Sequence, residues 1–120
     1  MITKSITRKL TEMTLLACAM LFCGMSLASA DDIAEGKKVA FDRKKGNCLA
    51  CHMMSDGALP GNIGPPLIAM KARFPDYDKL RDQIYDARKN NPNTIMIPFG
   101  PHAVMSAKEI DLVTTFIHTL

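Results

Sequence analysis

The stretch Cys48-Leu49-Ala50-Cys51-His52 places two thiols and an imidazole in the spacing C-x-x-C-H. This spacing attaches a c-type haem: each thiol adds to one vinyl group of the porphyrin, and the adjacent imidazole binds the iron from one face. We therefore expect one covalent haem c on Cys48 and Cys51, with His52 as the first iron ligand. The function class that such a cofactor indicates is electron transfer.

The cysteine pair could have two other uses. A disulfide or a redox C-x-x-C would suit an exported chain, but a thioredoxin-like site needs a βαβ pattern that the sequence lacks. A zinc site would need two further ligands, which only His102 and His118 could supply. Haem attachment is the favoured interpretation.

The first thirty residues have the pattern of a signal peptide. A basic segment with Lys4, Arg8 and Lys9 precedes an apolar run over 15–27, and small residues end it at Ala30. We expect residues 1–30 to be cleaved and residues 31–120 to form one cytochrome c domain in the periplasm. An uncleaved membrane anchor is the alternative, but the apolar run is short for a bilayer. A lipoprotein site at Cys18 would leave too little apolar sequence ahead of it.

The composition of the expected mature chain bears on which classes of protein it could belong to. It keeps two of the four cysteines and five of the nine methionines, and its 12 basic and 11 acidic side chains nearly cancel. Such a balance gives no reason to expect nucleic-acid binding or stable membrane insertion. A domain of about 90 residues has a core of marginal stability, which a covalent haem would complete. We expect the apoprotein to be poorly folded.

The periodicity predicts an all-α fold of three main helices with long loops around one haem. The first helix is expected to begin at Asp32, with Glu35 as its capping-box partner, and to run to Phe41. Gly36 costs about 1 kcal/mol within a helix, so we expect a second helix to pack closely against it.

The other two helices follow from their capping residues. One is expected from Tyr77 to Lys89, entered through Asp76 and stopped by Asn90-Asn91-Pro92. The last is expected from Ser106, with Glu109 closing a capping box. Its apolar stripe consists of Ile110, Val113, Phe116, Ile117 and Leu120. The Gly- and Pro-rich loops 54–70 and 90–105 are where haem contacts should arise.

The second iron ligand separates an electron carrier from a catalyst. Met96 is the favoured candidate because prolines bracket its segment and should hold it as an ordered loop. Met53 and Met54 are tethered beside His52, and Met70 and Met105 adjoin predicted helices, where methionine more often fills the core. His102 is a weaker rival. Thioether ligation would raise the reduction potential.

The ring of His52 needs an acceptor for its second N–H. The carbonyl of Pro65, in Gly64-Pro65-Pro66-Leu67, could accept that bond. The alternative is that the two prolines only stiffen a turn.

Taken in order, several blocks of this sequence resemble SoxX, the small monohaem c-type subunit of the sulfur-oxidation complex SoxAX. The haem motif alone would match any c-type cytochrome, but the ordered combination is more specific. The blocks are Gly46-Asn47-Cys48 to His52, Gly61-Asn62-Ile63-Gly64-Pro65-Pro66-Leu67, Arg73-Phe74-Pro75-Asp76, Asn91-Pro92 through Met96 to Pro98-Phe99-Gly100, and Ser106-x-x-Glu109-Ile110.

The resemblance implies a class I cytochrome c fold, His/Met ligation through His52 and Met96, and a periplasmic heterodimer with a SoxA-type cytochrome. In that family the complex is an L-cysteine S-thiosulfotransferase that oxidatively joins thiosulfate to a cysteine of the carrier SoxYZ. The monohaem subunit passes electrons to a downstream acceptor, and the bond-forming site belongs to SoxA. Ile97 replaces the first proline of the family's Met-Pro-Pro-Phe-Gly, and the chain is short for the family. These departures bear on the geometry of the partner contact more than on haem ligation.

Two further functions remain open at this level. A free-standing shuttle cytochrome that delivers electrons to a terminal oxidase would have a charged haem rim and weak, transient contacts. A permanent subunit would instead expose an apolar patch near the haem edge. A small haem peroxidase would need an open coordination position on the iron.

Overall fold

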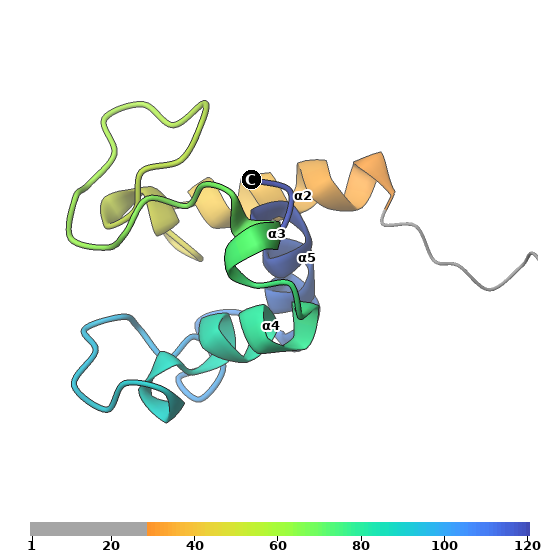
Figure 1. Ribbon diagram of the computed structural model, residues 1–120. Helices are drawn as coiled ribbons and strands as arrows, with labels where there is room; N and C mark the ends of the chain where they lie inside the picture. The colour runs from red at the N-terminus through yellow and green to blue at the C-terminus, as the bar shows by residue number, and fades with distance from the viewer. Residues whose placement is uncertain (1–28) are drawn as a thin grey trace, which may run out of the picture.

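The computed structural model describes residues 29–120, and these form helices joined by loops (Figure 1). The predicted signal peptide falls almost wholly on residues 1–28, outside the described residues. No strand occurs within 29–120, which confirms the predicted all-α class. The elements are α2 (Ala30–Phe41), the 3-10 turn η1 (Cys48–Ala50), α3 (Met70–Arg73), α4 (Tyr77–Tyr85), the 3-10 turn η2 (Ala87–Lys89) and α5 (Ala107–Ile117).

The start of α2 differs from the prediction. Ser29 is the N-cap: its hydroxyl accepts from the backbone N–H of Asp32, and the Asp32 carboxylate accepts from the backbone N–H of Ser29. Asp32 is therefore the third residue of the helix and not its cap, and Glu35 pairs with Lys38 on the surface. Cleavage after Ala30, as the sequence predicts, would remove Ser29 and this capping box.

Helix α4 begins where the sequence predicts but ends earlier. The carboxylate of Asp76 accepts from the backbone N–H groups of Asp78 and Lys79, which confirms Asp76 as the cap. The expected helix to Lys89 breaks at Asp86, whose backbone is extended. The Asp86 side chain accepts from the backbone N–H of Arg88 and starts η2 instead.

Helix α5 has the predicted cap and the predicted apolar stripe. Ser106 and Glu109 form a reciprocal capping box. The backbone N–H of Ser106, and then the ammonium of Lys45 at 3.0 Å, lower the pKa of the Glu109 carboxyl. Four of the five stripe residues are buried, and Leu120 lies beyond the helix end.

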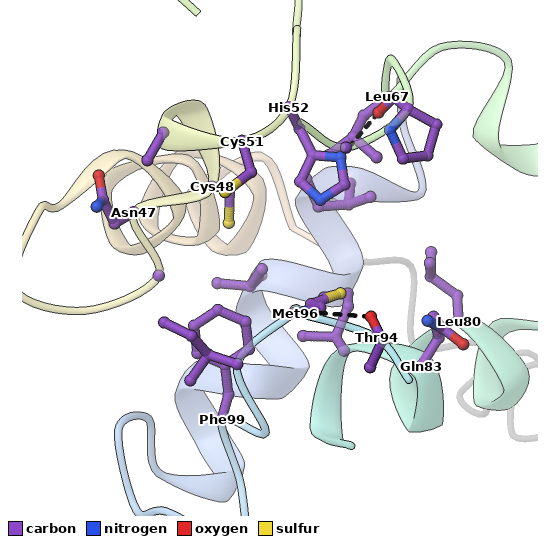
Figure 2. Close-up of a pocket in the computed structure, with 18 of the residues that line it drawn as sticks. Asn47, Cys48, Cys51, His52, Leu67, Leu80, Gln83, Thr94, Met96 and Phe99 are labelled. Carbon is purple, nitrogen blue, oxygen red and sulfur yellow. Dashed lines mark hydrogen bonds between the residues drawn. The ribbon is translucent and has the colours of Figure 1, made fainter. Parts of the chain in front are cut away.

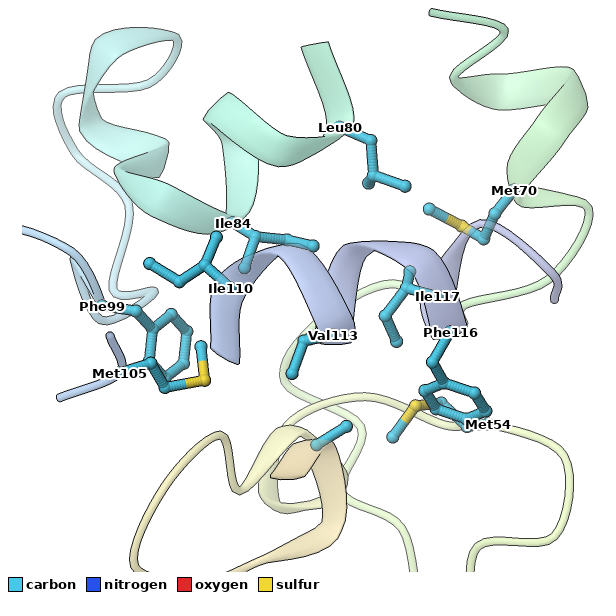
Figure 3. Close-up of a cluster of buried hydrophobic side chains, with 11 residues drawn as sticks. Met54, Met70, Leu80, Ile84, Phe99, Met105, Ile110, Val113, Phe116 and Ile117 are labelled. Atoms are coloured by element: carbon cyan, nitrogen blue, oxygen red, sulfur yellow. The ribbon is translucent and has the colours of Figure 1, made fainter. Parts of the chain in front are cut away.

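The buried side chains gather on both sides of α5. Figure 3 shows Leu80 and Ile84 of α4 on one side of α5, with Ile110 and Val113 along its face. Helix α2 packs against the other side, where the rings of Phe41 and Phe116 meet edge to face at 6.0 Å. Helix α5 is thus the element that both other main helices contact. No helix within 29–120 has the length and apolarity needed to cross a bilayer.

The α2–α5 contact is closest at Gly36, as the sequence predicts. A Cβ atom at this position would lie 2.0 Å from the carbonyl oxygen of Leu112 and 3.0 Å from Cβ of Phe116. Because the Leu112 carbonyl belongs to the backbone of a packed helix, it cannot move aside without shifting α5.

We predict that Gly36→Ala lowers the free energy of unfolding of the haem-loaded protein by about 1–3 kcal/mol, the usual cost of overpacking. Gly57→Ala is the matched control, because its new methyl would meet only the flexible end of the Leu49 side chain. Chemical denaturation of both variants measures the difference. Equal stabilities would show that the two helices can separate without cost.

Candidate functional site

A cavity of about 340 Å³ opens between the motif loop, α3, α4, α5 and the loop before Phe99. Its volume lies within the usual range of about 300–1,000 Å³ for ligand and cofactor sites. Every residue to which the sequence assigned a role lines this cavity: Cys48, Cys51, His52, Pro65 and Met96. The rest of the lining is mainly apolar, which suits the porphyrin ring of a haem.

Main-chain hydrogen bonds hold the motif loop against α2. The backbone N–H of Gly46 donates to the carbonyl of Val39 at 3.1 Å, and that of Asn47 donates to Asp42 at 3.0 Å. Asn47 has a left-handed backbone with φ 46°, which turns the chain into η1. His52 then donates from its backbone N–H to the carbonyl of Cys48 at 2.9 Å. This single turn places the imidazole and both thiols beside one cavity.

The state of the cysteines favours haem attachment over the two alternatives. Both are free thiols, and burial, followed by the charge of Cys51, raises the pKa of Cys48 to about 11. A redox-active cysteine has a lowered pKa, which the burial of Cys48 opposes. Among residues 29–120, no three His, Cys, Asp or Glu side chains gather to hold a metal ion, which leaves the zinc alternative without support.

The imidazole of His52 is oriented from two sides. Its Nδ1 lies 2.8 Å from the carbonyl oxygen of Pro65. Because a carbonyl can only accept, Nδ1 carries the proton and the lone pair of Nε2 is left for a metal. A Cβ at Gly64 would lie between 2.3 and 2.8 Å from three ring atoms, so the ring rests directly against the backbone.

The loop that carries Pro65 is tied to the motif by further main-chain bonds. Gly64 donates to the carbonyl of Cys51 at 2.7 Å, and Leu67 donates to Met53 at 2.8 Å. The acceptor for the His52 ring is therefore fixed relative to His52 itself.

Met96 faces His52 across the cavity in Figure 2. The Thr94 hydroxyl accepts from the backbone N–H of Met96 at 3.1 Å. This bond fixes the backbone of the loop at the residue that carries the thioether. This role of Thr94 was not predicted, although a hydroxyl two residues before a loop methionine is a signal for such a bond. With His52 and Met96 on either side, the cavity could hold a haem iron between a nitrogen and a sulfur.

The rival ligands lie elsewhere or are already engaged. Met53, Met54 and Met105 do not line the cavity. Met70 lines it, but its sulfur accepts from the guanidinium of Arg73 at 3.4 Å and its side chain is buried in the core. His102 is exposed and lies outside the lining.

These features indicate the class of the protein: a small all-α fold of the c-type cytochrome kind. The fold is similar to that of a chain in the crystal structure of SoxXA from P. pantotrophus, with a TM-score of 0.65 and 26% sequence identity. The match covers 72% of this chain and 79% of that chain.

Sequence comparison is less specific. An uncharacterized lipoprotein of Aquifex aeolicus is 33% identical over 76 residues, which are 62% of this chain. The chain spans only 37% of the length of that protein. No protein-family model matches the chain.

We predict that Gly64→Ala displaces the His52 ring, because the new methyl has no room beside it. If Cys48 and Cys51 carry a haem and His52 binds its iron, the haem should stay attached, while the absorption spectrum shows a fraction of the iron without a histidine ligand. Stability should fall by about 1–3 kcal/mol. Gly57→Ala again serves as the control. A wild-type spectrum in Gly64→Ala would contradict the described position of the ring.

Proposed function

We propose that this protein is a periplasmic monohaem c-type cytochrome and the electron-transfer subunit of a SoxAX-type complex. Cys48 and Cys51 hold the haem, and His52 and Met96 ligate its iron. The observation that carries the proposal is that one cavity brings both thiols, a histidine with a free Nε2 lone pair and a facing thioether together. The complex would attach thiosulfate oxidatively to a cysteine of a SoxYZ-type carrier.

The ligand set suits an acceptor of electrons. When bound, the haem supplies one-electron oxidation and reduction, and a His/Met pair raises its potential relative to other ligand sets. The Pro65 carbonyl fixes the proton of His52 on Nδ1, so the ring needs no proton rearrangement when the iron changes charge. The protein therefore holds the iron and relays electrons, while bond formation takes place in the partner.

The rim of the cavity favours a permanent partner over a free shuttle. Ile63, Ile95 and Ile97 line the cavity and are 63%, 78% and 48% exposed. Exposed apolar groups at a haem rim are what a subunit interface would cover. The similarity to a chain of SoxXA supports a cytochrome of the SoxA type as that partner.

The export of the chain is part of the proposal. The haem motif, the basic and apolar N-terminal pattern and the lipoprotein relative all support a protein outside the cytoplasm. We place cleavage after Ala30, which leaves the domain 31–120 in the periplasm.

Replacing Met96 with Ala tests the ligand assignment. The reduced iron should then bind carbon monoxide, and the midpoint potential should fall by roughly 100 mV or more, since axial ligands set haem potentials over about 0.8 V. Met105→Leu is the control, because Met105 is a buried methionine that lies outside the cavity lining. If Met70→Leu opened the iron and Met96→Ala did not, Met70 would be the ligand.

Affinity purification tests whether the protein has a stable cytochrome partner. The chain, tagged at its C-terminus and produced in its native periplasm with thiosulfate present, should bring down a second haem-stained cytochrome in stoichiometric amount. Ile95→Lys should abolish this recovery, because the side chain is 78% exposed at the rim. Its haem spectrum is recorded as well, because Ile95 lines the cavity and precedes Met96. Recovery of a lone monohaem protein would favour the free shuttle.

A further inference from the structure

The loop that follows the C-x-x-C-H motif carries a fully displayed apolar side chain. Leu59 is 97% exposed, more than any other large apolar residue within 29–120. Its backbone is left-handed, with φ 52°, and Pro60 follows it. A leucine seldom adopts this conformation, because its Cβ then crowds the neighbouring carbonyl group. The side chain therefore adds nothing to the core, and the backbone that displays it is strained.

The tip of this loop, residues 58–60, is fixed on both sides. Before the tip, the Asp56 carboxylate pairs with the ammonium of Lys37 in α2 at 3.0 Å. After the tip, the backbone N–H of Gly61 donates to the carbonyl of Leu49 in η1 at 2.8 Å. The tip thus has a set position before any partner binds, which reduces the conformational entropy lost on binding.

The tip lies on the same side of the molecule as the apolar rim of the cavity. In Figure 1 the loop after η1, in yellow-green, and the loop after η2, in cyan, both extend away from α5 toward the left of the picture. The first loop carries Leu59 and then Ile63, and the second carries Ile95 and Ile97. All four side chains are exposed, and the last three line the cavity. The surface of one partner that covers the rim can therefore reach the tip through Ile63.

We propose that Leu59 is an anchoring residue of the interface with the partner cytochrome and inserts into an apolar pocket on that partner. This inference rests on the proposed function, which places the partner at the rim of the cavity. A few side chains that become fully desolvated in well-packed pockets dominate the energy of most interfaces. The pocket is apolar, because a polar group covered by the leucine would lose its water without gaining a hydrogen bond. The strained display of Leu59 lowers the stability of the free chain and strengthens the complex.

Leu59→Asn tests this role, because Asn accepts the left-handed backbone and removes the apolar side chain. Wild-type and variant chains with different C-terminal tags are produced together in the native periplasm, where they compete for the partner. The second cytochrome recovered with each chain is then quantified. The variant should bind the partner about 10- to 100-fold more weakly, the effect of losing one fully buried leucine side chain. Its haem spectrum should match that of the wild type, and its resistance to denaturant should be equal or higher.

Two further variants complete the test. Leu59→Met keeps an apolar side chain of similar volume and should retain most of the binding. Ile68→Asn is the matched control, since Ile68 is also an exposed apolar residue, at 55%, but lies outside the tip and the cavity lining. It should compete for the partner as well as the wild-type chain does.

Equal recovery of the partner with Leu59→Asn and with the wild type would overturn the anchoring role while leaving the proposed complex in place. An equal loss with Ile68→Asn would do the same, as would a lower stability or a changed haem spectrum in Leu59→Asn, which would show a structural role. If the wild-type chain recovers no second cytochrome, the proposed partner is wrong and the anchoring role with it.

Discussion

The close contact between α2 and α5 is the constraint on which the rest of the structure depends. Gly36 lets the backbone of α2 reach the Leu112 carbonyl, and a side chain there would separate the helices. The motif loop leaves the end of α2 and is bonded back to it through Gly46 and Val39. The position of the thiols relative to α5, which forms one wall of the cavity, therefore depends on the close contact at Gly36 and on the bond from Gly46 to Val39.

The site itself is built mostly by loops that are tied to one another through backbone groups. His52, its acceptor Pro65 and the glycine beneath its ring belong to two segments joined by several main-chain hydrogen bonds. Met96 comes from a separate loop, held by Thr94 at its start. Such an arrangement holds His52 and Met96 in place, which would suit the electron transfer proposed above.

Helix caps were predicted from the sequence where the local capping pattern was unambiguous. Asp76, Ser106 and Glu109 cap helices as expected, because a cap depends on residues three positions apart. Overlapping capping boxes at Ser29–Asp32 and Asp32–Glu35 could not be told apart by such rules, and Ser29 belonged to the segment expected to be removed. The sequence also continues a helical pattern past Asp86, but the Asp86 side chain accepts from the backbone N–H of Arg88, and α4 ends there.

That Thr94, Arg73 and Gln83 line one cavity could be known only from the fold, because it depends on how segments distant in sequence come together. By contrast, the spacing of the motif and the prolines around Met96 were enough to select the residues that line the cavity. Residues marked by short spacings could be predicted, whereas the polar side chains around them in the cavity could not.

The central claim, a haem held by Cys48 and Cys51, is tested most directly by the mass of one peptide. Trypsin cleaves after Lys45 and next after Lys71, so the exported protein should yield a peptide 46–71 that contains both cysteines. We predict that this peptide carries one haem and has no thiol that can be alkylated. A haem-free peptide with two reactive thiols or an internal disulfide, from protein exported by cells able to make c-type cytochromes, would contradict it.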